Sequence, residues 1–217
     1  MNFFQNFLNS NKNLREIAEK DFEKINEISF KESFPIFKEG ILCEKPEINQ
    51  LANLLMKKVY FENKKNLNEN EIFEIKNFIQ NVINFNLNNT NFNWKSFQRL
   101  GENLAEIYFK LGINNYFNEV LFYINNNNNN KNSKKFGIYL IEILSELNAI
   151  NDDLIKNNLN DFINLFNNIL NDDDNNNIKS ILNFFININN DEILANFSFL
   201  LQIIYKNILN KNNENLF

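Results

Sequence analysis

Histidine is absent from this chain, and cysteine occurs once, as Cys43. No disulfide can form within the chain, and the usual Cys/His zinc sites and Ser-His or Cys-His nucleophile pairs cannot be built. Glycine is also scarce, and its four copies lie too far apart to form a phosphate-binding loop: Gly40, Gly101, Gly112 and Gly137. The common signatures of catalysis are missing, so we expect a protein that is not an enzyme and that uses no cofactor or metal.

Long apolar runs are missing as well. The two longest cover residues 136–144 and 197–204, whereas a membrane-spanning helix needs about 20 apolar residues. The N-terminal segment has neither the basic start nor the apolar centre of a signal peptide. The formal net charge of −5 argues against a basic face for nucleic acid. We expect a soluble, intracellular protein that contacts neither membrane nor nucleic acid directly.

Two residue types are abundant instead, asparagine with 53 copies and phenylalanine with 24. Asparagine is a mediocre helix former, which costs roughly a few tenths of a kcal/mol per position. Apolar residues make up 44% of the chain, which is enough for a substantial core. Any helices must therefore be stabilised mainly by burying Phe, Ile and Leu.

The clearest periodicity lies in residues 46–60, PEINQLANLLMKKVY. Pro46 near the first turn suits the start of a helix, and Lys57 and Lys58 near the end suit its dipole. The apolar residues recur at the spacing of one helix face: Ile48, Leu51, Ala52, Leu55, Met56, Val59 and Tyr60. We predict an amphipathic helix with one broad buried face.

Similar patterns recur along the whole chain. They predict ten helices: 14–25, 30–41, 46–60, 69–85, 93–112, 116–124, 133–150, 152–171, 177–188 and 191–209. Ser29 with Glu32 predicts a capping box for the second helix, and Asn13 with Glu16 predicts a weaker one for the first. No segment shows the alternation of a strand followed by a hairpin turn. The sequence therefore predicts an all-α fold.

The ten helices are expected to pair into about five two-helix repeats in a single array over residues 1–217. The expected repeats are 10–43, 46–86, 93–124, 133–171 and 177–209. Repeats of this length are typical of HEAT and armadillo proteins, whose pairs stack into a right-handed superhelix (solenoid) because one pair cannot bury its own apolar face. Most first helices carry a small residue that permits close packing: Ala18, Ala52, Gly101, Ala105 and Gly137. The alternative is one globular helical bundle, which would not require the repeated small residue.

Residues 14–60 carry a more specific pattern. LREIAEKDF has the form (V/L)R-x-x-A-E-x-x-(L/F), and INQLANLLMKK, from Ile48, has nearly the form (I/V)-R-Q-L-A-A-L-L-L-K-N. These two helix motifs resemble the N-terminal domain of the importin-β family. WKSFQRLGENLAEIYFKLG, from Trp94, resembles more weakly the third repeat of large importins that carry ribosomal proteins and histones. The second motif departs from the family at three positions: Asn49 for Arg, Asn53 for Ala and Lys58 for Asn.

The resemblance implies a nuclear transport receptor that shuttles between cytoplasm and nucleus. In this family the inner second helices of the N-terminal repeats bind Ran in its GTP form, and this binding releases import cargo. Basic protein cargo and FG-nucleoporins are bound largely by later repeats. Family members have many more than five repeats, so the resemblance implies an N-terminal segment. The alternative is a HEAT-repeat scaffold that joins other proteins without binding Ran.

Lys57 and Lys58 are the candidate partner-binding residues, because Lys57 occupies the lysine position of the family motif near the repeat turn. The alternative is that both lysines only solvate the end of a helix. The aromatic stripe Phe30, Phe34 and Phe37 is a second candidate for a partner groove. Its spacing is that of a buried helix face, so we expect it to be core.

Two polar segments are interpreted as loops. Residues 125–135 are of low complexity and are expected to form a flexible insertion rather than a basic interaction tag. The acidic stretch 171–177 resembles the start of a calcium loop, but it has Asn177 and Asn183 where an EF-hand needs glycine and glutamate. We expect an acidic loop or a helix start there, and no calcium site.

Overall fold

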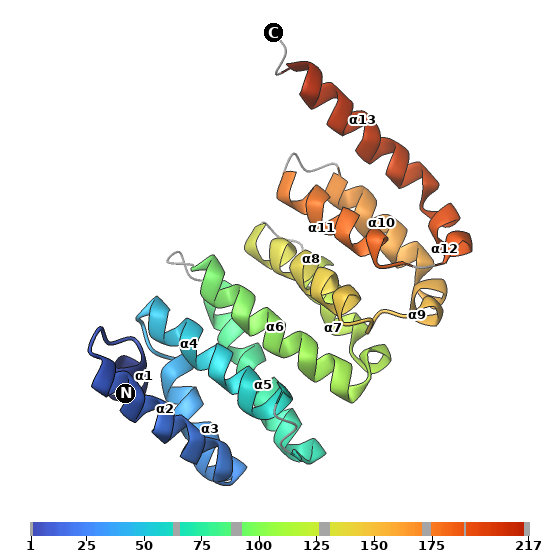
Figure 1. Ribbon diagram of the computed structural model, residues 1–217. Helices are drawn as coiled ribbons and strands as arrows, with labels where there is room; N and C mark the ends of the chain where they lie inside the picture. The colour runs from blue at the N-terminus through green and yellow to red at the C-terminus, as the bar shows by residue number, and fades with distance from the viewer. Residues whose placement is uncertain are drawn as a thin grey trace. The chain divides into compact units, whose positions relative to one another are not determined.

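The computed structural model describes residues 2–62, 66–87, 93–125, 131–170, 175–188 and 190–214. All regular structure within these residues is helical, which confirms the predicted all-α class (Figure 1). The chain divides into two compact units, Met1–Ile107 and Tyr108–Phe217. Each unit has its own set of buried apolar side chains.

The first unit begins with short helices and ends within a long one. Its described helices are α1 (Asn2–Phe7), α2 (Lys12–Glu27), α3 (Phe30–Ile41), α4 (Pro46–Lys57), the π-helical turn η1 (Lys58–Glu62), α5 (Glu69–Leu87) and most of α6 (Trp94–Leu111). α3 packs against α4, and α1 packs against α2 and α4. α4 runs directly into η1, so the predicted helix 46–60 is confirmed with a wider last turn. The sequence patterns do not predict α1, whose Phe4 is buried.

Local capping interactions determine where these helices begin. Ser29 and Glu32 form the predicted capping box at α3, and the Glu32 carboxylate accepts the Ser29 backbone N–H at 3.1 Å. The Ser29 hydroxyl first, and this N–H second, lower the pKa of Glu32. The predicted cap of α2 is wrong, because Asn11 is the N-cap and accepts the Asn13 N–H at 3.0 Å. Pro46 opens α4 as predicted.

Aromatic side chains form the core of the first unit. Phe30, Phe34 and Phe37 of α3 surround Tyr60 of η1, with ring centroids 5.5 to 6.2 Å from the tyrosine ring. All four side chains are buried, which confirms that the aromatic stripe is core. The Tyr60 hydroxyl shares a 2.8 Å hydrogen bond with the Ser33 hydroxyl, so its polar end has a partner.

The second unit continues from the end of α6 with shorter helices. They are the 3₁₀ turn η2 (Ile113–Asn115), α7 (Phe117–Asn125), α8 (Lys131–Glu146), α9 (Asp152–Asn157), α10 (Leu159–Leu170), α11 (Asn175–Ile186), α12 (Asp191–Asn196) and α13 (Ser198–Glu214). α8 packs against α7 and α11, and α10 packs against α11 and α13. Gly112, before η2, has a φ of +85°, a left-handed conformation that glycine adopts without strain.

Two helices predicted as continuous are interrupted in the second unit. The predicted helix 152–171 is divided at Asn158 into α9 and α10, and the predicted helix 191–209 is divided at Phe197 into α12 and α13. The break at Phe197 has a packing role, because its ring is fully buried and its centroid lies 6.0 Å from that of Phe166. Tertiary packing therefore overrides the continuous helical pattern.

The two interrupted helices also begin alike. The side chains of Asn151 and Asn190 accept backbone N–H groups of α9 and α12 at 2.8 to 3.2 Å. The Asn190 amide also donates to the Asp152 carboxylate at 2.7 Å, so the two helix starts are in contact. The two capping residues are 39 positions apart in the sequence.

Phenylalanines fill the core of the second unit. Phe162 and Phe166 of α10 and Phe184 of α11 are buried, with ring centroids 5.0 to 6.0 Å apart. The predicted close packing at small residues is confirmed here, because a Cβ at Gly137 of α8 would collide with the Ile124 side chain of α7. In the first unit, a Cβ at Gly40 would lie only 2.6 Å from the Ala52 Cβ.

The predicted loop 125–135 is wrong at its second half. Residues 126–130 lie outside the described residues, but α8 already begins at Lys131. The buried Ser133 hydroxyl donates to the Tyr123 carbonyl of α7 at 2.7 Å, and the Phe136 and Tyr123 rings lie 5.1 Å apart. These contacts stabilise the first turns of α8, which low-complexity composition does not anticipate. Of the predicted acidic segment, residues 171–174 lie outside the described residues, and 175–177 begin α11.

Candidate functional site

The candidate partner-binding residues Lys57 and Lys58 lie where α4 continues into η1. Lys57 Nζ is 3.2 Å from Glu106 Oε1 of α6, and these side chains are 22% and 16% exposed. Lys58 is exposed, and its Nζ lies 5.8 Å from the centre of the Phe22 ring. The charge of Lys57 is thus paired within the first unit, while Lys58 faces solvent. A role of either lysine in partner binding stays a prediction.

A chain of three asparagines connects α4 to α6. The Asn49 amide donates to the Ile41 carbonyl, and the Asn53 amide donates to the backbone and side-chain oxygens of Asn49 at 3.0 and 3.2 Å. The Asn103 amide of α6 donates to both oxygens of Asn53 at 3.2 Å. Asn53 and Asn103 are fully buried. Asn49 and Asn53 occupy positions where this sequence departs from the importin motif, so the departures build a polar contact between helices.

Two buried polar atoms of α6 have no hydrogen-bond partner within the described residues. They are the side-chain oxygens of Asn103 and Ser96. A buried polar group without a partner costs about 1–3 kcal/mol, so native proteins contain few of them. Within the described residues, these two oxygens of α6 therefore lack the hydrogen bonds that buried polar groups usually make.

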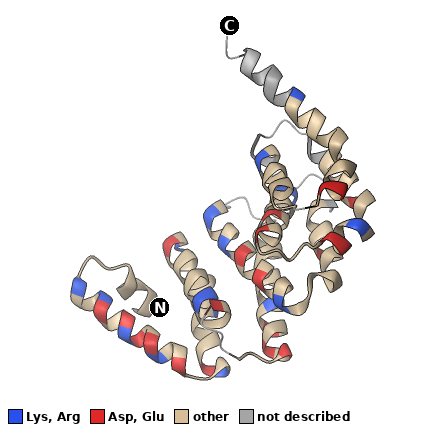
Figure 2. Cartoon of the chain, turned by 45° about the vertical axis from the view of Figure 1, so that its right-hand side comes forward, with Lys and Arg blue, Asp and Glu red and all other residues tan. Residues whose placement is uncertain are grey.

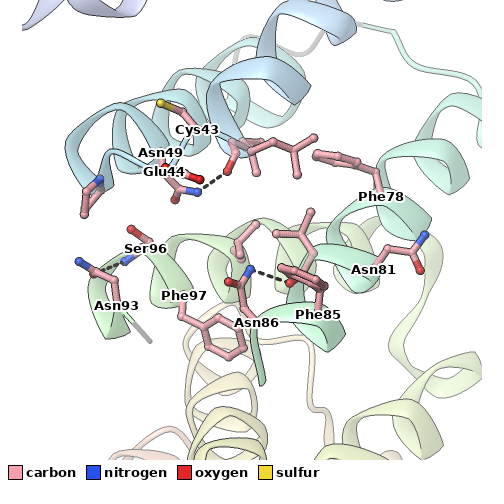
Figure 3. Close-up of a pocket in the computed structure, with 15 residues that line it drawn as sticks. Cys43, Glu44, Asn49, Phe78, Asn81, Phe85, Asn86, Asn93, Ser96 and Phe97 are labelled. Atoms are coloured by element: carbon pink, nitrogen blue, oxygen red, sulfur yellow. Dashed lines mark hydrogen bonds between the residues drawn. The ribbon is translucent and has the colours of Figure 1, made fainter. Parts of the chain in front are cut away.

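A cavity of about 790 Å³ lies in the first unit (Figure 3). One wall comes from the end of α3, the connection to α4 and the first turns of α4; the other comes from α5 and the start of α6. The lining residues are Ile41, Leu42, Cys43, Glu44, Pro46, Asn49, Phe78, Asn81, Val82, Phe85, Asn86, Asn93, Ser96, Phe97 and Leu100. Apolar side chains, amides and one carboxylate thus share this surface.

Three of the four amide side chains that line the cavity, those of Asn49, Asn86 and Asn93, make hydrogen bonds. The Asn86 amide donates to the Val82 carbonyl at 2.8 Å, and the Asn93 side-chain oxygen accepts the Ser96 backbone N–H at 3.1 Å. Figure 3 shows Asn49 on one side of the gap, with Asn86 and Ser96 on the other. Fixed polar groups of this kind can orient a bound molecule without first being ordered.

The sequence patterns do not predict this cavity, because its residues come from separate segments and are ordinary helix and loop residues. Cys43 forms part of the wall and is buried. Leu42 and Phe85, at 63% and 71% exposure, are large apolar side chains at its edge. Asn49, where the importin motif has arginine, is the one sequence signal that could have drawn attention to the site.

Charged residues do not form a basic face on α2, the most highly charged helix. Figure 2 shows basic and acidic residues interspersed along its ribbon. Lys12 pairs with Glu16 at 3.5 Å and Lys24 pairs with Asp21 at 3.0 Å. Exposed pairs of this kind contribute at most about 1 kcal/mol each, and they leave no concentrated positive charge for a phosphate backbone.

Several kinds of site are not found in the part of the chain that the structure describes. It contains no group of three or more His, Cys, Asp or Glu that could hold a metal ion. Among the described helices, none combines the length and the apolarity needed to cross a bilayer. No protein-family model matches this chain, and neither does any curated protein or solved structure. Function must therefore be inferred from the residues themselves.

Proposed function

We propose that this chain is a HEAT-repeat segment that acts by binding proteins, and that it is the N-terminal part of a nuclear transport receptor. In this proposal the chain binds Ran in its GTP form and supports import of basic protein cargo. Most cargo contacts and the FG-nucleoporin contacts belong to repeats outside this chain. The protein then works in both the cytoplasm and the nucleus, by binding rather than by catalysis.

The importin-like segment carries the proposal. Its first motif corresponds to α2 and its second to α4. Four apolar motif positions of α4 are buried (Ile48, Ala52, Leu55 and Met56), whereas Leu51 is half-buried and Leu54 is 45% exposed. Lys57, at the lysine position of the motif, is the last residue of α4. Agreement between a specific motif and the buried face of the helix that contains it supports a structural similarity over a chance one.

The contacts within the second unit support a HEAT-type stack. α8 packs against α11, and α10 packs against α13, so first helices contact first helices and second helices contact second helices. The two interrupted helices recur after about 39 residues, close to the length of a HEAT repeat. In the proposal all helix pairs continue this stacking as a right-handed solenoid, which buries faces that one pair leaves exposed.

Ran-GTP would act on such a stack through differential affinity. A solenoid whose repeats contact only their neighbours can change curvature through small shifts at each interface. If Ran-GTP binds a curvature that holds cargo poorly, its binding shifts the population toward that curvature and releases cargo. Ran-GDP, with lower affinity, would leave cargo bound.

One observation favours the alternative of a scaffold without Ran binding. Lys57, the motif lysine, is mostly buried and paired with Glu106, which leaves it less available to a partner. Partner binding by the α4 end would then depend on Lys58, the position where this sequence departs from the motif.

The test is calorimetric titration of the chain with Ran loaded with GTP and with GDP at physiological salt. We expect at least about tenfold tighter binding of the GTP form, equivalent to about 1.4 kcal/mol. Lys58→Glu should weaken binding, while Lys12→Glu, which changes another exposed lysine, should not.

Equal binding of both forms, or none, would favour the scaffold unless the chain is too short to hold Ran. A C-terminally extended chain distinguishes these cases. If the extended chain also fails to prefer Ran-GTP, the transport proposal is wrong.

A further inference from the structure

One side of α11 carries hydrogen-bonding side chains, and another carries phenylalanines. Ser180, Asn183 and Asn187 recur at spacings of three and four residues, so they share one stripe, with Asn187 directly after the helix. Phe184 and Phe185 lie on a different stripe, and both are buried. α11 therefore presents two chemically different faces to its neighbours.

The polar stripe of α11 faces α8, and the two helices pack side by side (Figure 1). The Glu142 carboxylate of α8 accepts the Ser180 hydroxyl at 2.6 Å and also accepts the Asn183 amide. One turn further along, the Asn187 amide donates to the Ser145 hydroxyl at 3.1 Å. We call these five residues the polar seam.

Water already reaches most of the polar seam. Ser180, Asn183 and Asn187 are half-buried, as is Glu142, and only Ser145 is buried, at 5% exposure. When such a bond breaks where water can enter, water replaces the lost partner, so the bond contributes little net stability. Separating α8 from α11 therefore exchanges hydrogen bonds with water and leaves no polar group unsatisfied.

The opposite side of the same helices is joined by aromatic rings. Phe117 of α7 and Phe162 of α10 are buried, and their ring centroids lie 4.9 Å apart. The Phe162 ring also lies 5.4 Å from that of Phe184, which joins α10 to α11. Opening this side would expose rings to water, at a cost that grows with the apolar area. The aromatic side is therefore much harder to open than the polar seam.

We propose that the polar seam is the opening side of a hinge between the helix pair α7 and α8 and the helix pair α10 and α11. The contact of Phe117 with Phe162 stays closed as the pivot, while α8 and α11 separate and water enters between them. This motion changes the angle between the two pairs, which is a change of curvature. Its use in cargo release rests on the proposed function, but the opening is a property of this chain and is tested without Ran.

Two cysteine variants of the full chain test the opening. Ile141→Cys places a thiol on the seam face of α8, one turn before Ser145. Leu140→Cys places one on the face toward α7, one turn after Gly137, whose position contacts Ile124 of α7. Both replaced side chains are buried and aliphatic, at 2% and 0% exposure, so the variants are matched in their loss of packing.

The measurement is the rate of iodoacetamide labelling at each introduced thiol, resolved by mass spectrometry, with unfolded chain as the fully reactive reference. We expect the Ile141→Cys thiol to react at least about tenfold faster than the Leu140→Cys thiol. Its rate should stay nearly constant in urea below the unfolding transition, because the opening exposes little surface. The Leu140→Cys rate should rise steeply with urea, because that thiol becomes reactive only when the unit unfolds.

Glu142→Gln tests whether the hydrogen bonds keep the seam closed. The amide that replaces the carboxylate has one acceptor oxygen, so it cannot accept from Ser180 and Asn183 in the same way. Labelling of Ile141→Cys should accelerate about fivefold, and labelling of Leu140→Cys should not change. Glu23→Gln, the same change at an exposed position of α2, should alter neither rate.

Two results would overturn the proposal. The first is equal labelling of both thiols with the same steep dependence on urea, which would show that the seam opens only when the unit unfolds. The second is any response to Glu142→Gln other than selective acceleration at Ile141→Cys. Neither result bears on the Ran titration, and absent Ran binding would leave the hinge in place, so the two proposals fail separately.

Discussion

The two units of the molecule differ in how far their hydrogen-bonded polar side chains are buried. In the first unit, Asn53 and Asn103 lie fully inside the core, and the Asn103 side-chain oxygen has no partner within the described residues. In the second unit, the half-buried Glu142 carboxylate of α8 accepts the Ser180 hydroxyl at 2.6 Å and the Asn183 amide. The amides of the first unit are sealed from water, whereas the carboxylate of the second can still contact it.

This difference shows what burial requires in an asparagine-rich chain. An amide has two donor hydrogens and an acceptor oxygen, and satisfying all of them inside a core needs several well-placed partners. Phenylalanine has no such requirement and fills the core of the second unit. We infer that packing dominates the stability of the second unit, and that the first unit depends on its buried amide contacts in addition to its aromatic core.

The largest expected effect is the loss of a central ring in the second unit. Phe184→Ala removes a fully buried side chain whose ring contacts those of Phe162 and Phe166, so the free energy of unfolding should fall by about 3–5 kcal/mol. Urea denaturation followed by circular dichroism measures the change. Phe199→Ala, at an exposed position of the same unit, should stay within about 0.5 kcal/mol. A loss below 1 kcal/mol for Phe184→Ala would contradict a packing-dominated unit.

The second effect tests the asparagine chain of the first unit. Asn103→Leu leaves the buried Asn53 side-chain oxygen without its donor from α6, but it also removes the unpaired Asn103 oxygen, so the free energy of unfolding should fall by only about 1 kcal/mol. The double variant Asn53→Leu with Asn103→Leu removes both partners and should recover much of that loss. Strictly additive losses would show that the two amides are not coupled. Asn183→Leu in the second unit should cost less, because its partner Glu142 remains partly in contact with water.

The smallest effect concerns one tyrosine in each unit. Burial raises the pKa of Tyr60. The hydrogen bond with Ser33 lowers this pKa by a smaller amount, and the negative charges of Glu71 and Glu74 raise it to a lesser extent. Burial, and then Glu119, raise the pKa of Tyr123. The contribution of each tyrosine to the free energy of unfolding is complete below its unfolded pKa of about 10. It is lost as the pH rises above that value, because the tyrosine of the unfolded chain loses its hydroxyl proton before that of the folded chain does. Each tyrosine should lower the free energy of unfolding by about 1.4 kcal/mol per pH unit in that range.

Urea denaturation between pH 9 and pH 11 measures this slope, in a range of about one unit on each side of the ordinary tyrosine pKa. Tyr60→Phe and Tyr123→Phe should each reduce it, whereas Tyr205→Phe, at an exposed position, should leave it unchanged. Equal slopes in all three variants would mean that neither buried tyrosine keeps its proton in the folded chain.

The sequence by itself determined the helical class and the buried face of most helices. The spacing of Phe30, Phe34 and Phe37 was enough to predict core, and Ser29 with Glu32 was enough to predict the start of α3. These features depend on residues three or four positions apart, because one helical turn brings such residues together. A pattern of that range can be recognised without knowing the rest of the fold.

Only the tertiary structure decided which distant groups meet. Asn53 and Asn103 are 50 positions apart, and no local pattern shows that their amides form one chain. The break at Phe197 and the pairing of Lys57 with Glu106 likewise depend on neighbouring helices. The cavity depends on how α5 and α6 approach α3 and α4. The physical reason is that helix formation is governed by hydrogen bonds within one turn, whereas these contacts follow from the packing of whole helices, which local periodicity leaves open.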